Sequence, residues 1–94
     1  MSYKVTKKAQ TDLAALVDLS LERFGTHTAA RYVDALERTL EGLARGDFDG
    51  PEVLIASRAR PVHRWPVPPY WPYYERVSGE LRLLRIYHGA REPL

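Results

Sequence analysis

The hydrophobic pattern of the 94-residue chain predicts an α+β fold, in which a helical hairpin packs on a small antiparallel β-sheet. Apolar residues recur at helical spacing through residues 7–24 and 28–45, whereas residues 73–88 alternate like two adjacent strands. The predicted order of elements is β-α-α-β-β-β. A chain of this length forms one domain, residues 1–94.

The first strand and the first helix are predicted at the N-terminus. Residues 3–5 alternate like a short strand, and the Thr6 hydroxyl can cap a helix that begins at Lys7. Gly25 ends this helix. Its apolar stripe consists of Ala9, Leu13, Leu16, Val17 and Phe24. An apolar stripe of this kind must cover another layer of the fold.

A second helix is predicted to begin at Thr28 as its N-cap and to end near Arg45. The short connection around Gly25 indicates that the two helices pack as an antiparallel hairpin. The residues of its apolar face are Val33, Leu36, Leu40 and Leu43. Gly42 within this helix indicates a close approach to the first helix.

Residues 46–61 are predicted to be a long connection, and residues 62–65 resume strand character. Four prolines then follow within seven residues, which predicts that residues 66–72 form a stiff connection rather than a regular strand. Two strands, residues 73–77 and 80–88, are predicted to follow, joined by the two-residue turn Ser78-Gly79.

The last strand is apolar on both faces, so its alternation alone does not decide which face meets the helices. We expect Leu84 and Ile86 to point toward the helices, which sends Arg85 and Tyr87 to the open face. An arginine within an apolar strand needs a partner where it is buried, for example Glu75 on the neighbouring strand.

The charge of the chain is uneven. Residues 1–57 hold seven Lys or Arg against nine Asp or Glu, whereas residues 58–94 hold seven Arg against three Glu. Arginine suits carboxylate, phosphate and aromatic partners, so the C-terminal part is the place for an acidic partner or a nucleic acid. Each of these arginines could equally be a solvated surface residue.

Several classes of protein are excluded by composition. The sequence contains no apolar run near the roughly 20 residues of a membrane-spanning helix and no apolar segment typical of a signal peptide. It contains no cysteine, and its three histidines lack metal-ligand spacing. We therefore expect a soluble, cytoplasmic protein without a metal or another cofactor.

The sequence resembles a known protein family over nearly its whole length. It is similar to the ParE branch of the RelE/ParE toxins of bacterial type II toxin-antitoxin modules. The residues that carry the resemblance are Tyr3-Lys4-Val5 before Ala9, Asp12 and Leu13; Arg23-Phe24-Gly25 before Ala30, Tyr32 and Leu36; Trp65-Pro66-Val67; Tyr74; and Leu84-Arg85-Ile86-Tyr87-His88-Gly89-Ala90-Arg91. The fold of that family is the one predicted above.

The resemblance implies a toxin held inactive by a cognate antitoxin, ParD-like or of another class, with a role such as plasmid stabilisation. The ParE branch is associated with inhibition of DNA gyrase through protein binding. The RelE branch is associated with cleavage of messenger RNA on the ribosome, which is an endoribonuclease activity. A third reading is a family member that has lost its toxicity and persists as an antitoxin-binding relic.

Cleavage of RNA needs a base, an acid and cations for the developing phosphorane charge. The residues that could fill these roles are Arg64, Arg85, Tyr87, His88 and Arg91. Nucleases of the RelE branch usually place a further arginine shortly before the tyrosine matched by Tyr74, where this chain has Trp71. The second helix also contains no lysine. Both departures favour the gyrase-binding reading.

An antitoxin of this family lays a helix and an extended segment across its toxin, so we expect a hetero-oligomer with an acidic amphipathic peptide. The predicted partner-binding residues are Arg58, Arg60, Arg64, Trp65, Trp71, Tyr74, Arg85, Tyr87 and Arg91. The aromatic residues among them could instead belong to the core, and His88 could satisfy a backbone group at the end of its strand.

Overall fold

The computed structural model describes residues 3–55 and 58–89. Two helices and five strands follow one another along the chain. They are β1 (Tyr3–Val5), α1 (Lys7–Phe24), α2 (Thr26–Arg45), β2 (Glu52–Val53), β3 (Val62–Arg64), β4 (Tyr70–Val77) and β5 (Glu80–His88). The strands form one sheet in the order β1-β5-β4-β3-β2. The predicted α+β fold with a helical hairpin on a sheet is confirmed.

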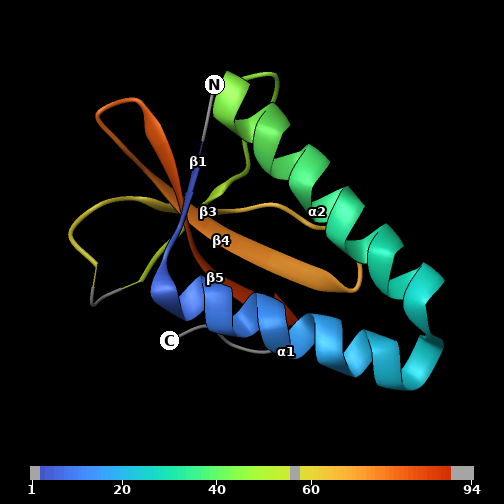
Figure 1. Ribbon diagram of the computed structural model, residues 1–94. Coiled ribbons are helices and arrows are strands. Elements are labelled where there is room, and N and C mark those ends of the chain that lie inside the picture. The colour runs from blue at the N-terminus through green and yellow to red at the C-terminus, as the bar shows by residue number, and fades with distance from the viewer. Residues whose placement is uncertain (1–2, 56–57, 90–94) are drawn as a thin grey trace.

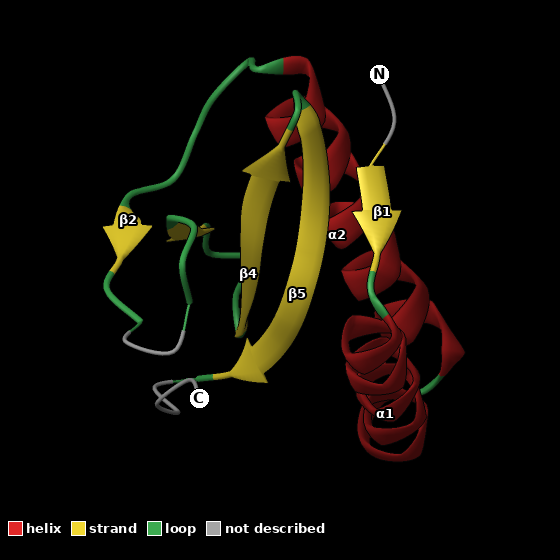
Figure 2. Ribbon diagram, turned by 90° about the vertical axis from the view of Figure 1, so that its left-hand side faces the viewer, coloured by secondary structure: helices red, strands yellow, loops and turns green. Residues whose placement is uncertain are grey.

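The sheet is mixed. Strands β3, β4 and β5 pair antiparallel in succession, as expected, and β2 adds an antiparallel pair with β3. Strand β1 pairs parallel with β5, with Tyr3 opposite Leu81. Strand β2 lies within the connection that was predicted for residues 46–61. Figure 2 shows α1 and α2 on the side of β1 and β5, whereas β2 lies at the opposite edge of the sheet.

The predicted boundaries of α1 are confirmed, whereas the predicted start of α2 is not. The Thr6 hydroxyl accepts a hydrogen bond from the Ala9 amide at 3.3 Å, which confirms the predicted cap of α1. Gly25, with φ +88°, ends α1 and also precedes α2, so the prediction that Thr28 caps α2 is wrong. A single glycine with positive φ turns the chain within one residue. The two helices meet at this glycine and diverge from it in a V shape (Figure 1).

The main core lies between the helices and the sheet. It joins apolar residues of α1 and α2 to side chains of β1, β4 and β5. Leu43, Tyr74, Leu81 and Leu83 are completely or almost completely buried there. At about 25 cal/mol per Å² of apolar area, this layer is the main source of stability for so small a domain.

The direction of Leu84 differs from the prediction. Ile86 packs in the helix-side core as expected, but Leu84 packs on the opposite face, and Leu81 and Leu83 face the helices instead. The pairing register of β4 with β5 shifts between Tyr73 and Tyr74, so β5 carries one extra residue at this β-bulge. A bulge reverses the alternation along its strand, which a simple two-residue period cannot anticipate.

Strand β4 begins at Tyr70 and contains Pro72, so the prediction of a connection through residue 72 is wrong. Pro72 lies opposite Ile86, whose amide donates outward to Asp12 rather than across to β4. A proline at this position therefore costs no hydrogen bond between β4 and β5. On the other side of β4, the Pro72 carbonyl accepts a hydrogen bond from the Trp65 amide at 3.2 Å.

Gly42 does mark a close approach, but its neighbour differs from the prediction. A Cβ atom at this position would overlap the ring of Phe48, which belongs to the loop after α2 and not to α1. Phe48 in turn packs on Trp65, with ring centroids 4.6 Å apart. The loop after α2 therefore folds back over its own helix.

Candidate functional site

A second apolar cluster lies on the sheet face opposite the helices. Its buried members are Val62, Tyr73, Leu84 and Tyr87, and its partly buried members are Val53, Ile55 and Trp71. In the part of the chain that the structure describes, the segment around β2 packs against this cluster through Val53 and Ile55, and no helix contributes to it. We call this face, with its rim, the open sheet face. A small, partly covered apolar face of this kind suits contact with another macromolecule.

Arginines surround the open sheet face. The Arg64 guanidinium lies 4.5 Å from the centroid of the Trp71 ring and donates to the Tyr73 hydroxyl at 3.3 Å. Arg58 forms an ion pair of 3.0 Å with Glu75, whose side chain is almost fully buried. Among the residues that the structure describes, Arg60 is exposed and has no hydrogen-bond or ion-pair partner.

The loop after β2 adds an exposed apolar residue to this rim. Leu54 is fully exposed, with a relative accessibility of 100%, which is unusual for a leucine. A hollow of about 440 Å³ lies between Leu54 and Pro61, and Arg58 and Arg60 contribute to its walls. An apolar side chain beside two guanidinium groups matches an amphipathic acidic ligand.

Arg85 is held at the edge of β5 by α1. Its guanidinium donates twice to the Asp12 carboxylate, at 2.8 and 3.2 Å, and the Ile86 amide donates to the same carboxylate at 2.9 Å. The hydrogen bonds with Asp12 raise the pKa of Arg85 further above its ordinary value. The interpretation of Glu75 as the partner of Arg85 is wrong, because Glu75 pairs with Arg58.

Tyr74 is buried and belongs to a hydrogen-bond cluster on the helix side that reaches the exposed Asp49. Its hydroxyl donates to Asp49 at 2.5 Å and accepts from the Gly50 amide at 2.7 Å, while Arg76 donates to Asp49 at 3.2 Å and His63 Nδ1 lies 2.8 Å from the Gly50 carbonyl oxygen. Burial and the hydrogen bond to Asp49 raise the pKa of Tyr74 to about 12. Burial alone would raise the pKa of Asp49, but the hydrogen bonds from Tyr74 and Arg76 lower it overall.

The structure thus separates the predicted site residues into two groups. The first group lies on the open sheet face and its rim and contains Arg58, Arg60, Arg64, Trp71, Arg85 and Tyr87. Trp65 and Tyr74 belong to the helix side. His88 is exposed at the end of β5, where its ring meets Tyr70 at 5.3 Å. Arg91 lies outside the described residues.

Sequence reasoning missed Asp12 as the residue that positions Arg85. Both residues stood in the motifs that carry the family resemblance, but nothing in one sequence links two positions 73 residues apart. In residues 3–55 and 58–89, no group of three or more His, Asp or Glu side chains is placed to hold a metal ion. Neither helix in these segments has the length and apolarity needed to cross a membrane.

Comparisons with known proteins agree with this geometry. The family described as "ParE toxin of type II toxin-antitoxin system, parDE" matches residues 3–93. A solved structure titled "Chromosomal ParDE TA system from P. aeruginosa" shares the fold, with a TM-score of 0.76 and 22% identity over 95% of this chain and 96% of that chain. No curated protein sequence matches. Because the family match spans nearly the whole sequence, the chain belongs to the ParE toxin family of type II toxin-antitoxin systems.

Proposed function

We propose that this ParE-family toxin inhibits DNA gyrase through protein binding and is neutralised by a cognate antitoxin. The observation that carries the choice of gyrase over RNA cleavage is the engagement of Arg85, whose charge is paired with Asp12 at 2.8 Å. Tyr87, the second residue that a nuclease would use, is buried at 8% exposure and packs on Tyr73. A paired cation and a buried phenol are poorly placed to act on a phosphodiester.

The open sheet face is the proposed site of the antitoxin. Trp71 and Leu54 offer apolar contact area, and Arg60 and Arg64 offer positive charge beside them, whereas the charge of Arg58 is paired with Glu75. An acidic amphipathic segment would satisfy both features at once. Toxin and antitoxin would then form a hetero-oligomer in the cytoplasm, where the proposed target also acts.

Inhibition of gyrase is tested with purified components. Supercoiling of relaxed plasmid by DNA gyrase is measured with and without the toxin, and we expect inhibition that the purified antitoxin reverses. Full supercoiling at micromolar excess of toxin would overturn the proposal. Primer extension on messenger RNA after induction tests the nuclease alternative, since new transcript ends dependent on translation would favour it.

The antitoxin interface is tested by variants of the open sheet face. We expect the Arg60→Ala, Arg64→Ala double variant to bind the antitoxin at least tenfold more weakly than the wild type, because both guanidinium groups face the proposed acidic partner. Arg45→Ala is the matched control, since Arg45 is exposed at the end of α2 and pairs with Asp47. Equal losses in the two variants would contradict the proposed position. Absence of growth arrest on expression alone would favour the non-toxic relic.

A further inference from the structure

A row of four aromatic side chains crosses the end of the molecule at which α1 gives way to α2. The ring centroids of Phe24 and Tyr32 lie 6.5 Å apart, those of Tyr32 and Tyr70 lie 5.6 Å apart, and those of Tyr70 and His88 lie 5.3 Å apart. The four residues come from α1, α2, β4 and β5. Both ends of the row are exposed, and Phe24 shows 58% of its surface to solvent.

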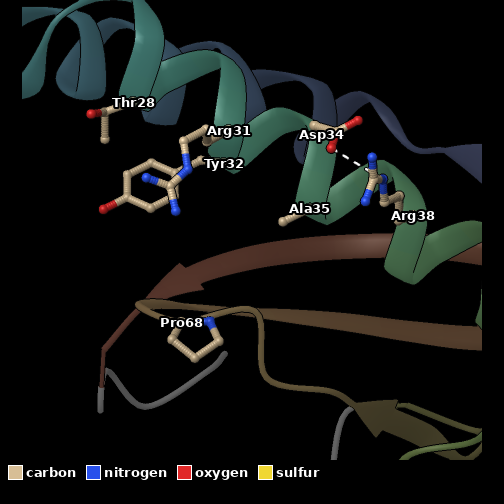
Figure 3. A pocket seen from close by; sticks show the side chains of 7 residues that line it. All are labelled: Thr28, Arg31, Tyr32, Asp34, Ala35, Arg38 and Pro68. Atoms are coloured by element: carbon tan, nitrogen blue, oxygen red, sulfur yellow. Dashed lines mark ion pairs between the residues drawn. The ribbon is translucent and has the colours of Figure 1, made fainter.

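Two hollows flank this aromatic row, and an exposed arginine stands in each. The first, of about 550 Å³, lies between α2 and Pro68 and is lined by Thr28, Arg31 and Tyr32. Figure 3 shows these three side chains projecting from α2 toward the loop that carries Pro68. The second hollow, of about 390 Å³, lies between α1 and the end of β5, and Arg23 lines it.

Each of the two hollows is lined by two arginines and one carboxylate. The carboxylate in the first hollow, Asp34, pairs with Arg38 at 3.1 Å (Figure 3), and the carboxylate in the second is Asp12, already paired. Arg23 and Arg31 are exposed and have no hydrogen-bond or ion-pair partner among the described residues. The two guanidinium groups are therefore available to an anionic ligand.

We propose that this end binds a single-stranded polynucleotide. Arg23 and Arg31 would each contact a phosphate, one on either side of the aromatic row, and Phe24 would stack on a base between them. Rings between two cations match the alternation of bases and phosphates along a strand, and base stacking on aromatic side chains tolerates any sequence. A purely acidic peptide would satisfy the charges but would leave the exposed ring without a stacking partner.

The surface is tested by fluorescence anisotropy with a labelled 12-nucleotide DNA and an RNA of the same sequence, without gyrase. We expect a Kd of about 1–100 μM at physiological salt. The Arg23→Ala, Arg31→Ala double variant should bind at least tenfold more weakly, and the slope of log K against log salt should become shallower by about 1.4, since each single-strand phosphate contributes about 0.7. Phe24→Leu keeps an apolar side chain but loses stacking, and should weaken binding about tenfold.

Arg60→Ala is the matched control, because Arg60 is also exposed and unpaired among the described residues. Figure 1 shows its loop, between β2 and β3, at the opposite end of the molecule from the turn between α1 and α2. We expect Arg60→Ala to change the Kd by less than twofold, and every variant to keep the wild-type circular dichroism spectrum and melting temperature.

Three results would overturn the proposal. These are no binding at low salt, an equal loss of affinity in Arg60→Ala, and equal displacement of the oligonucleotide by a polyglutamate of the same length, which would assign the surface to an acidic peptide. A preference for DNA or for RNA identifies the natural strand. Gyrase inhibition is measured separately, so oligonucleotide binding without inhibition would refute only the function proposed above.

Discussion

Among single residues, Asp12 makes the contacts that most affect the edge of the sheet. Strand β1 pairs with β5 only as far as Leu83. Beyond this residue, the Asp12 carboxylate accepts hydrogen bonds from the Ile86 amide and from the Arg85 guanidinium. An uncovered strand edge invites pairing with another chain, so this carboxylate also guards against aggregation. The sequence predicted that Arg85 needs a partner, but it could not identify a partner that lies 73 positions away.

Removal of this carboxylate should be costly. We expect Asp12→Ala to lower the free energy of unfolding by about 2–4 kcal/mol, because two charge-assisted hydrogen bonds and one bond to an edge amide are lost together. Urea unfolding measures the effect. Asp34→Ala is the control, since its exposed pair with Arg38 should contribute less than about 0.5 kcal/mol. Equal losses of stability in both variants would show that the contacts of Asp12 with Arg85 and Ile86 contribute no more than an exposed ion pair.

Tyr74 gives a prediction that depends on pH. Tyr74→Phe should cost about 1–3 kcal/mol at pH 7, because the buried Gly50 amide loses its acceptor. Since the pKa of Tyr74 is raised to about 12, the unfolded chain releases this proton first, and the contribution of the hydroxyl falls as pH rises above about 10. Urea unfolding at pH 7, 9, 10 and 11 should show the difference between wild type and variant narrowing above pH 10. A constant difference across that range would contradict the assignment.

Among the elements, both helices and the β4–β5 hairpin could be predicted because each has a strong local period and a clear boundary. The turn between these strands has positive φ at Ser78 and Gly79, as a two-residue hairpin requires. The incorrect predictions concern which residues face one another in the sheet, and not the periodicity of the individual segments. Pro72 fits in a strand because the facing Ile86 amide points away from it, and the bulge at Leu84 depends on the register with β4. Whether a strand tolerates a proline or contains a bulge depends on its pairing with the neighbouring strand, which the sequence of the strand alone does not reveal.

The loop that follows α2 is fixed by a glycine at the sheet. A Cβ atom at position 50 would overlap the carbonyl oxygen of Arg64, so we expect Gly50→Ala to destabilise the fold by about 3 kcal/mol. In Gly42→Ala the added methyl would overlap only the movable ring of Phe48, and a gain in helix propensity of about 1 kcal/mol partly compensates. Thermal and urea unfolding of both variants would test this order. A larger loss in Gly42→Ala would mean that the Phe48 ring cannot move.

At the scale of the whole molecule, the sequence identified candidate residues for the site but did not predict how they are arranged in space. The concentration of arginine after residue 57 pointed to the sheet, and Arg58, Arg60 and Arg64 do lie around its open face. The aromatic row near α2 was missed, because its four members are far apart in the sequence and come together only after the helices and strands have packed.

A domain of 94 residues has a limited core, so binding of its proposed partner should change its stability noticeably. At a free antitoxin concentration of 100 times Kd, we expect the toxin to gain about 2.7 kcal/mol. This gain corresponds to a rise in Tm of roughly 10–20 °C for a domain of this size. Differential scanning calorimetry of the toxin with increasing antitoxin would measure it. A Tm that stays unchanged while the complex forms would mean that the antitoxin binds the unfolded chain equally well.

The parallel pairing of β1 with β5 has a consequence for the timing of synthesis. Strand β1 pairs with a strand far along the chain, with Tyr3 opposite Leu81, and the Thr6 hydroxyl donates to a carbonyl 77 positions later. A chain interrupted before Leu81 lacks nearly all of β5, the strand that joins β1 to β4 in the sheet. Residues 3–5 can therefore join the sheet only after residues 81–83 have been synthesised, and fragments that stop before Leu81 should be substrates for proteases.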